Sequence, residues 1–305
     1  MPARKNLIWI KIEAHSRNRK TRRILDDQAA PQYQGEMKTP HKKVSQKETR
    51  VNKKTSEIQY LKKVGTVRSC FGDRFGVPRQ SGLVPSSRGE IIFAKQYHPH
   101  QSLQGLNEFS HLWVIWGFHQ KQQLRFHAKV HPPLMGGESI GVFASRSPHR
   151  PSALGLSLVE IIEVKSDRII IGNHDLLDGT PVFDVKPYLP MYEAIPHAKM
   201  GWRNRHRHQP MEVRFSPSLI WGDDFTKKAN ANQLKELIVQ TLAQDPRPLI
   251  YRGENSKEKK YRTEHVVRIY DWDVFFQVMK DANGSETVEV TQVVFVGQGK
   301  KKAAR

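Results

Sequence analysis

From Glu57 onward the chain is a series of short runs rich in β-branched and aromatic residues, separated by Gly, Pro and polar residues. This texture is typical of strands joined by turns. Seven runs predict strands: Ile58–Val67, Glu90–Tyr97, His111–His119, Ser139–Ser145, Leu154–Val164, Arg168–His174 and Val182–Lys186. Only Gln101–Phe109 predicts a short helix between them. Many strands with few helices favour a mainly β fold, closed or sandwiched, over residues 57–200.

A smaller α+β domain is predicted over residues 217–305. Asp223–Ala243 has Leu234, Leu237, Ile238 and Leu242 at helical spacing, and Pro246 forbids continuation of this helix. Three strands are predicted to follow, and the last two are joined across Asn283-Gly284: His265–Asp271, Val274–Met279 and Thr287–Val296. Residues 201–216 are charged and poor in apolar residues, so we expect a linker there.

The net charge of +20 points to an anionic partner, and nucleic acid is the commonest one. Residues 1–56 hold 15 Lys and Arg against 5 Asp and Glu, which is half of that net charge. Few apolar residues follow Leu25 there, so we expect this extension to be disordered and to bind phosphates as a basic arm. Three alternatives stay open: a solvated tail, a transit peptide in the first thirty residues, and a start codon assigned too far upstream.

Several classes of protein are excluded. The longest apolar runs are shorter than the roughly 20 residues of a bilayer span, so we expect no membrane insertion. The single cysteine, Cys70, excludes an internal disulfide and a cysteine-based zinc site. The pairs His98/His100 and His206/His208 have no third ligand nearby, so we expect no metal. No glycine-rich loop opens a helix as a dinucleotide-binding or Rossmann methyltransferase site requires.

Four segments are denser in polar and special residues than ordinary connectors: residues 75–80 (FGVPRQ), 118–120 (FHQ), 143–151 (FASRSPHRP) and 175–188 (DLLDGTPVFDVKPY). Polar side chains at the ends of apolar strands build ligand sites at barrel mouths. Arginines on proline-stiffened loops present planar donors. Each segment alone is also compatible with a turn, but together they predict one binding site.

These motifs occur in the same order in a known family. V-P-R-Q, F-H-Q, F-A-x-R-S-x-x-R-P, D-L-x-D-G-T-P-x-x-D-x-K-P-Y and a late D-P-R-P resemble the TsaA-like (TrmO-type) tRNA methyltransferases, from about Val64 to the C-terminus. The resemblance implies a β-barrel domain that binds S-adenosylmethionine, followed by a small α+β domain, in a cytoplasmic homodimer. It also implies methylation of N6 of threonylcarbamoyladenosine at position 37, in the tRNA anticodon loop.

The resemblance also implies site residues. The cofactor contacts match Pro78, Arg79, Gln80, His119, Gln120, Arg146, Leu156, Asp175, Leu176, Leu177 and Asp178. Positions on the tRNA side, or structural ones, match Arg150, Lys186, Tyr188, Asp245 and Arg247, and Tyr188 is a candidate for stacking on a splayed base. Two departures occur: Ser152-Ala153 replaces the usual Asn-Pro, and one extra residue precedes Tyr251. The first departure bears on substrate positioning.

The acceptor nitrogen is conjugated and loses a proton on methylation, so a general base would help. Asp178, Asp184 and His119 are equal candidates, with the alternative that Asp178 caps the Asp-Gly turn. Two other functions stay open beside the tRNA methyltransferase. One is a catalytically silent RNA-binding protein, and the other is a methyltransferase of the same fold with a different acceptor.

Overall fold

The computed structural model describes residues 61–119, 125–205, 209–221, 231–248 and 264–297. The chain divides into two compact units, residues 1–57 and 58–305. The basic arm, Gln120, Tyr251 and the first part of the predicted helix Asp223–Ala243 lie outside the described residues. All of the described residues belong to the second unit.

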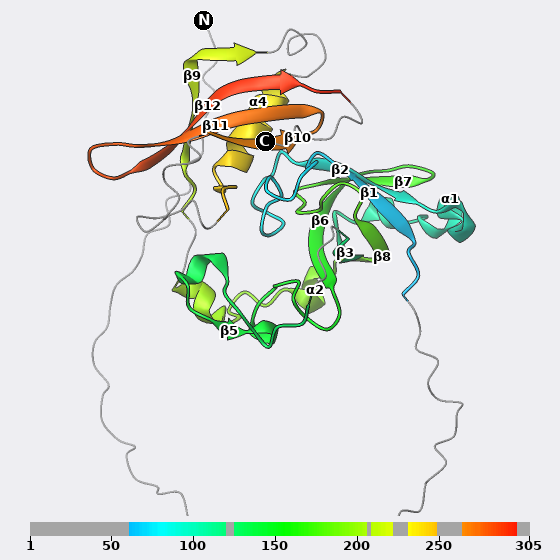
Figure 1. Cartoon of the computed structure of the whole chain (residues 1–305). Coiled ribbons are helices and arrows are strands. Elements are labelled where there is room, and N and C mark those ends of the chain that lie inside the picture. Colours follow the sequence, from blue (N-terminus) through cyan, green and yellow to red (C-terminus); the bar gives the residue numbers. More distant parts are fainter. Residues whose placement is uncertain (1–60, 120–124, 206–208, 222–230, 249–263, 298–305) are drawn as a thin grey trace, which may run out of the picture. The chain divides into compact units, whose positions relative to one another are not determined.

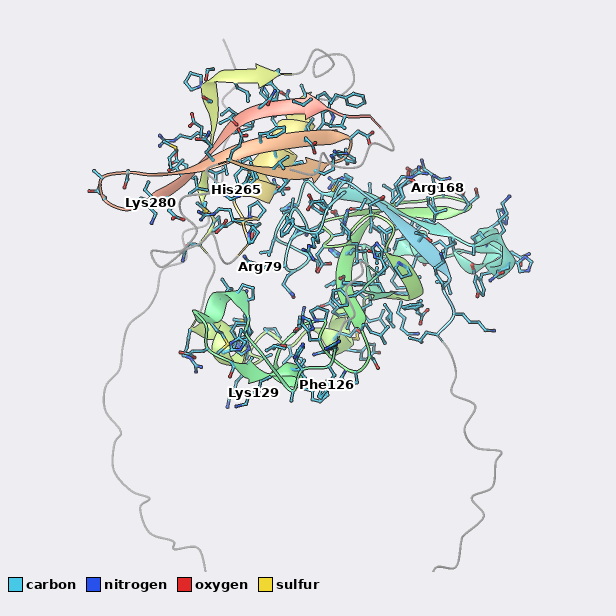
Figure 2. All side chains as sticks on the ribbon, in the orientation of Figure 1. Arg79, Phe126, Lys129, Arg168, His265 and Lys280 are labelled. Carbon is cyan, nitrogen blue, oxygen red and sulfur yellow. The ribbon has the colours of Figure 1, made fainter. Side chains whose placement is uncertain are left out.

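Six antiparallel strands close into a barrel in the order β1-β2-β7-β6-β3-β8 (Figure 1). The strands are β1 (Gly65–Ser69), β2 (Arg88–Phe93), β3 (His111–Gly117), β6 (Leu154–Val164), β7 (Arg168–Gly172) and β8 (Pro181–Pro187). Alternate residues of β1, β2 and β3 are buried and point into the barrel. On the barrel surface, Arg168 at the start of β7 bonds to Asp167 and Glu90 (Figure 2). The prediction of a mainly β fold is confirmed, and the architecture is a closed barrel.

Several predicted elements are shorter or interrupted in the structure, and three of them differ most. The predicted strand over residues 139–145 contains only β5 (Ile140–Gly141), which pairs with β4 (Lys129–Val130) and leads into the 3₁₀ turn η4 (Val142–Ala144). The strand predicted to reach Tyr97 ends at Phe93, and η1 (Lys95–Tyr97) follows. The predicted helix divides into α1 (Pro99–Ser102) and η2 (Leu106–Glu108), because Gly105 adopts a φ of +80° that ends a right-handed helix. A further 3₁₀ turn, η3, spans Pro133–Met135.

In the described residues, the C-terminal domain consists of a four-stranded sheet with helix α4 (Ala231–Leu242) packed against it. The sheet order is β10 (Glu264–Ile269), β11 (Trp272–Lys280), β12 (Glu286–Phe295) and β9 (Glu212–Trp221), and β9 pairs with β12 in parallel. Helix α4 buries Leu234, Leu237, Ile238 and Leu242 in the core of this domain. Gly284, with a φ of +81°, lies in the turn between β11 and β12, as the Asn-Gly pair predicts.

The prediction of a linker over residues 201–216 is wrong for the second half of this range. It contains η5 (Gly201–Asn204) and the first residues of β9. Val213 and Phe215 pack against the core of the C-terminal domain, while Glu212 and Arg214 between them are exposed. This alternation is that of a strand with one buried face, and pairing with β12 supplies its backbone partners. The domain therefore begins by Glu212. Preceding it, α2 (Pro190–Glu193) leads out of the barrel.

Among the helices that the structure describes, none has both the length and the apolar composition needed to cross a bilayer.

Candidate active site

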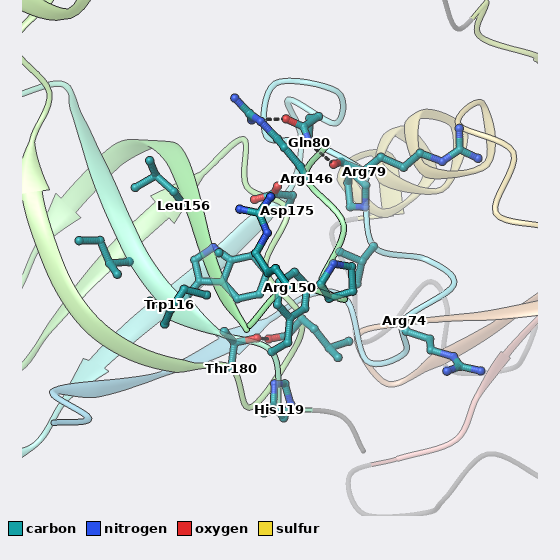
Figure 3. A pocket seen from close by; sticks show the side chains of 18 of the residues that line it. Arg74, Arg79, Gln80, Trp116, His119, Arg146, Arg150, Leu156, Asp175 and Thr180 are labelled. Atoms are coloured by element: carbon teal, nitrogen blue, oxygen red, sulfur yellow. Dashed lines mark hydrogen bonds between the residues drawn. The ribbon is translucent and has the colours of Figure 1, made fainter. Parts of the chain in front are cut away.

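A cavity of about 880 Å³ lies beside the barrel wall where β3 ends and β6 begins (Figure 3). It is lined by Arg74, Val77, Pro78, Arg79, Gln80, Trp113, Ile115, Trp116, Phe118, His119, Arg146, Pro148, His149, Arg150, Leu154, Gly155, Leu156, Asp175, Leu177 and Thr180. All four polar segments of the sequence contribute to it. They are far apart in the chain, and the barrel topology brings them together.

The apolar wall of the cavity comes from neighbouring strands. Trp113 and Ile115 of β3 alternate with fully buried residues and therefore point away from the barrel interior. Leu156 of β6 lies directly opposite Ile115 and is 54% exposed. The β3–β8 register shifts between Ile115 and Trp116. As a result Trp116, although mostly buried, also reaches the cavity, and its ring contacts that of Phe118 at 4.5 Å between centroids.

Gly155 permits the close approach of Trp116. A Cβ atom at position 155 would lie 2.2 Å from Cε2 of the indole, closer than real side chains pack. The indole Nε1–H donates to the Ser157 hydroxyl at 2.9 Å, which fixes the ring over the β6 backbone. Glycine is therefore required here for packing, and the rigid indole forms part of the cavity wall.

The polar end of the cavity is built by two loops that bond to each other. Arg146, from residues 142–151, donates to Oε1 of Gln80, and the Gln80 amide donates to the Arg79 carbonyl at 2.5 Å (Figure 3). Arg150 donates to the carbonyls of Ser145 at 2.8 Å and Val142 at 3.2 Å. Arg150 thus braces the loop that presents Arg146 to the cavity.

Asp175 is the acidic group of the cavity. Within the described part of the chain its Oδ1 atom is buried and has no hydrogen-bond partner. Burial raises the pKa of its carboxyl, against the smaller lowering effects of Ser157, backbone amides and the Arg146 charge. A buried carboxylate with spare acceptor capacity is costly unless a ligand supplies a cation or a hydroxyl. Asp175 is therefore a strong candidate for ligand recognition.

Eight of the eleven predicted cofactor residues line the cavity: Pro78, Arg79, Gln80, His119, Arg146, Leu156, Asp175 and Leu177. Gln120 lies outside the described residues. Leu176 does not line the cavity, because it is fully buried in the barrel core between two residues that do. Asp178 does not line it either. Its Oδ1 accepts from the Ser69 amide at 2.9 Å and its own amide donates to the Phe71 carbonyl at 3.0 Å, so Asp178 joins the start of the Asp-Gly turn to the chain that follows β1.

Of the three candidate bases, only His119 lines the cavity. Its ring lies beside Gly179, at which an added Cβ would be 3.4 Å from Nε2. Asp184 of β8 forms an ion pair with Lys186 at 3.0 Å and does not line the cavity.

The five predicted tRNA-side residues lie in three different surroundings. Arg150 lines the cavity, and its Nη2 donates to carbonyls of its own loop. Lys186 is exposed on β8, and the neighbouring Tyr188 is half-buried with its ring edge-on to Trp113. Asp245 and Arg247 form a buried bidentate ion pair, which Glu286 extends at 2.7 Å. The Arg247 side chain is only 7% exposed and is paired with two carboxylates, which favours the structural alternative for this pair.

Ser152-Ala153, at the position of the usual Asn-Pro, lies in a hydrogen-bonded segment. The Leu154 amide donates to the Ser152 carbonyl at 2.8 Å, and the Phe118 amide donates to the Ala153 carbonyl at 3.0 Å. Since His119 follows Phe118 directly, this second bond ties the end of β3 to the loop at position 153.

Sequence reasoning missed two aromatic residues of the wall, Trp113 and Trp116, although it included Phe118 in a predicted site segment. A signal for it exists: His111–Phe118 is nearly continuously apolar. Strands with one solvated face alternate polar and apolar residues, so a strand with two apolar faces indicates that its outer face is covered or lines a cavity.

Among the residues that the structure describes, no three His, Cys, Asp or Glu side chains come together as a metal site requires.

Fold and cavity together define a class of ligand-binding protein. It is a closed antiparallel barrel with a pocket beside its wall, and the pocket combines a buried carboxylate oxygen, arginines on loops and an aromatic wall. The chain belongs to the tRNA-methyltransferase O family. The model of that family's N-terminal domain matches residues 66–194, and the model of its C-terminal domain matches residues 208–295.

Named relatives agree with this assignment. The chain is 38% identical over 228 residues to the tRNA (adenine(37)-N6)-methyltransferase of Escherichia coli, covering 73% of this chain and 94% of that protein. It is 35% identical to the putative S-adenosylmethionine-dependent methyltransferase RcsF of Pseudomonas aeruginosa, over 69% of this chain and 89% of that protein. The crystal structure of TrmO from Pseudomonas aeruginosa superposes with a TM-score of 0.58 at 30% identity, covering 77% of this chain and 96% of that one.

Proposed function

We propose that this protein is an S-adenosylmethionine-dependent tRNA methyltransferase that methylates N6 of adenine 37, with threonylcarbamoyladenosine as the acceptor. Membership of the family and the names of the relatives support the reaction. The structural observation that carries the proposal is the cavity itself. It joins a carboxylate, one of whose buried oxygens has no partner among the described residues, and an arginine–glutamine pair to an aromatic wall that also includes a histidine.

The residues of the cavity fit S-adenosylmethionine, which when bound supplies an electrophilic methyl group. The Asp175 carboxylate suits an ammonium group or ribose hydroxyls, because its Oδ1 atom lacks a partner among the described residues. The planar donors of Arg146 suit a carboxylate. Trp116 and Leu156 exclude water from the apolar side, which strengthens the polar interactions beside them.

We assign the role of proton acceptor to His119. It is the candidate base that lines the cavity, whereas Asp178 accepts from the Ser69 amide and Asp184 pairs with Lys186. A neutral imidazole accepts a proton near neutral pH. Replacing His119 with Asn should lower kcat about 10²-fold or more, a larger effect than any change in cofactor affinity from the lost contact. Replacing Asp178 with Asn tests the alternative, and a comparable loss of kcat in that variant would contradict the assignment to His119.

The test of function is transfer of labelled methyl groups to tRNA with and without prior threonylcarbamoylation. Label on the modified tRNA alone supports the proposal. Label on neither favours a catalytically silent RNA-binding protein, and label on another acceptor favours a different substrate for the same fold.

A homodimer is part of the proposal. The segment after the barrel exposes Met191, Tyr192 and Ile195 at 84%, 79% and 71%. Adjacent exposed apolar side chains are typical of interaction surfaces. A dimer mass in light scattering supports this, and a monomer at micromolar concentration contradicts it. We expect the enzyme in the cytoplasm, where its tRNA substrate would be found.

A further inference from the structure

Trp113 lines the cavity, yet neither the sequence motifs nor the proposed reaction gives it a role. Its indole is held by two neighbours. The Nε1–H donates to Oε1 of Glu193 at 2.9 Å, and the Tyr188 ring contacts it edge-on at 5.9 Å and 81°. Glu193, the last residue of α2, is itself anchored, because its Oε2 accepts from the Leu189 amide at 2.7 Å. The orientation of the ring is therefore fixed.

Packing of the barrel does not explain this arrangement. The flanking residues Leu112 and Val114 point inward and are fully buried in the core, whereas Trp113 points outward and is only half-buried. A rigid aromatic surface that remains accessible is what a binding site needs, because the entropy cost of ordering it is met before the ligand arrives. The contact with Tyr188 is edge-on and not stacked, and the indole still lines the cavity.

The cavity has two chemically different ends. Arg79, Gln80, Arg146 and Asp175 line it on the loops beyond the end of β3. Trp113 lies four residues before Gly117 at that end, a distance of about 13 Å along a strand. Methyl transfer requires the donor and the acceptor in one cavity. The polar end suits the charged groups of the donor, which leaves the aromatic end for the acceptor.

We propose that Trp113 stacks on the acceptor nucleobase, a purine splayed from a single-stranded RNA loop, and that Glu193 and Tyr188 are positioning residues for it. The inference rests on the proposed function and deepens it. Aromatic side chains are the usual platforms for unstacked RNA bases. Lys186, the cross-strand partner of Trp113, is exposed nearby and suits the phosphate of the same nucleotide. In this proposal Trp113, and not Tyr188 as the sequence predicts, stacks on the base.

The test compares Trp113→Ala and Trp113→Phe with the wild type in steady-state methyl transfer to modified tRNA, alongside cofactor binding by calorimetry. The loss of one stacked base corresponds to a KM for tRNA raised about 10- to 100-fold in Trp113→Ala. The Kd for the cofactor should stay within about twofold. Trp113→Phe keeps an aromatic ring, so we expect a rise of only a few-fold. Tyr97→Ala, at a half-buried aromatic residue outside the cavity lining, is the control and should leave both constants unchanged.

A second readout isolates the positioning role. Glu193→Gln weakens the bond to the indole and should raise the KM for tRNA with little change in kcat. Stacking also quenches indole fluorescence, so tRNA should quench the wild type more than Trp113→Phe. Unchanged KM in both Trp113 variants, or a loss of cofactor affinity that equals the rise in KM, overturns the inference. If Trp113→Ala fails to fold, Trp113→Phe still tests it, since an unchanged KM and equal quenching overturn it. A wild type that methylates no tRNA refutes instead the proposed function.

Discussion

At the scale of single residues, the site depends on which side chains the backbone directs into the cavity and which it directs into the barrel core. Asp175 and Leu177 face the cavity, while Leu176 between them fills the barrel core. A contiguous motif was predicted to contact the cofactor along its whole length, but a chain in extended conformation presents alternate residues to opposite sides. Motif matching finds the segment, and the backbone geometry decides which of its side chains reach the ligand.

Asp175→Asn tests the role of the buried carboxylate. The amide keeps the shape but lacks the charge, so cofactor affinity should fall by about 1.5–3 kcal/mol, as for other hydrogen bonds to charged groups. Burial raises the pKa of this carboxyl, so ionisation costs the folded state free energy. The variant without ligand should therefore be at least as stable as the wild type. Calorimetric titration measures the cofactor affinity, and thermal unfolding measures the stability. Unchanged cofactor affinity in the variant would contradict the role of Asp175.

Gly155→Ala tests the packing of the wall. The added methyl group would lie 2.2 Å from the Trp116 ring, so the indole must move and its bond to Ser157 must break. Overpacking of this kind costs about 1–3 kcal/mol. The free energy of unfolding and cofactor affinity should both fall. Gly141→Ala is the matched control, because a Cβ there meets nothing within 4 Å. Equal behaviour of the two variants would rule out this account of the wall.

At the scale of elements, the sequence predicts the strands that carry strong alternation or β-branched runs. Leu154–Val164 is predicted with its observed bounds. The first half of β9 was taken for linker, because its Val213 and Phe215 alternate with charged residues next to a basic stretch. The partner of β9 is β12, about 75 positions later in the chain, and local sequence contains no information on such a pairing. The sequence predicts a site at the barrel mouth and not beside the wall for the same reason, because the position of the cavity depends on which strands become neighbours.

Trp202 links η5 to the loop that carries Arg146. Its Nε1–H donates to the Ala144 carbonyl at 3.0 Å. Trp202→Phe removes one hydrogen bond, worth about 1 kcal/mol, and loosens residues 142–151. We expect the KM for cofactor to rise a few-fold while the barrel stays folded. Tyr97→Phe serves as the matched aromatic control. Circular dichroism verifies the fold, and a Trp202→Phe enzyme with wild-type KM would mean that η5 does not support the loop.

At the scale of the whole molecule, stability should fall in acid because of a buried histidine. His174 is 1% exposed, and its Nδ1 accepts from the Leu176 amide at 3.2 Å. Burial lowers its pKa from 6.5 to about 4, so the unfolded chain takes up the proton first. The contribution of neutral His174 to the free energy of unfolding is fully present above pH 6.5. It is lost as the pH falls toward 4, by about 3 kcal/mol at most.

Urea unfolding between pH 7.5 and 4 measures this loss. His174→Gln should be less stable than wild type at neutral pH but should lose less stability on acidification. The exposed His100→Gln serves as the control and should keep the wild-type slope. Parallel curves for His174→Gln and wild type would show that another group causes the acid sensitivity.

The central claim is that the lateral cavity of the barrel transfers a methyl group to N6 of the modified adenosine at position 37. The most direct measurement is mass spectrometry of nucleosides from threonylcarbamoylated tRNA after incubation with S-adenosylmethionine and either the wild type or Asp175→Asn. The account predicts one added methyl group on N6 of threonylcarbamoyladenosine with the wild type, and much less product with the variant at limiting cofactor. A methyl group on another nucleoside, or equal product from both proteins, would contradict it.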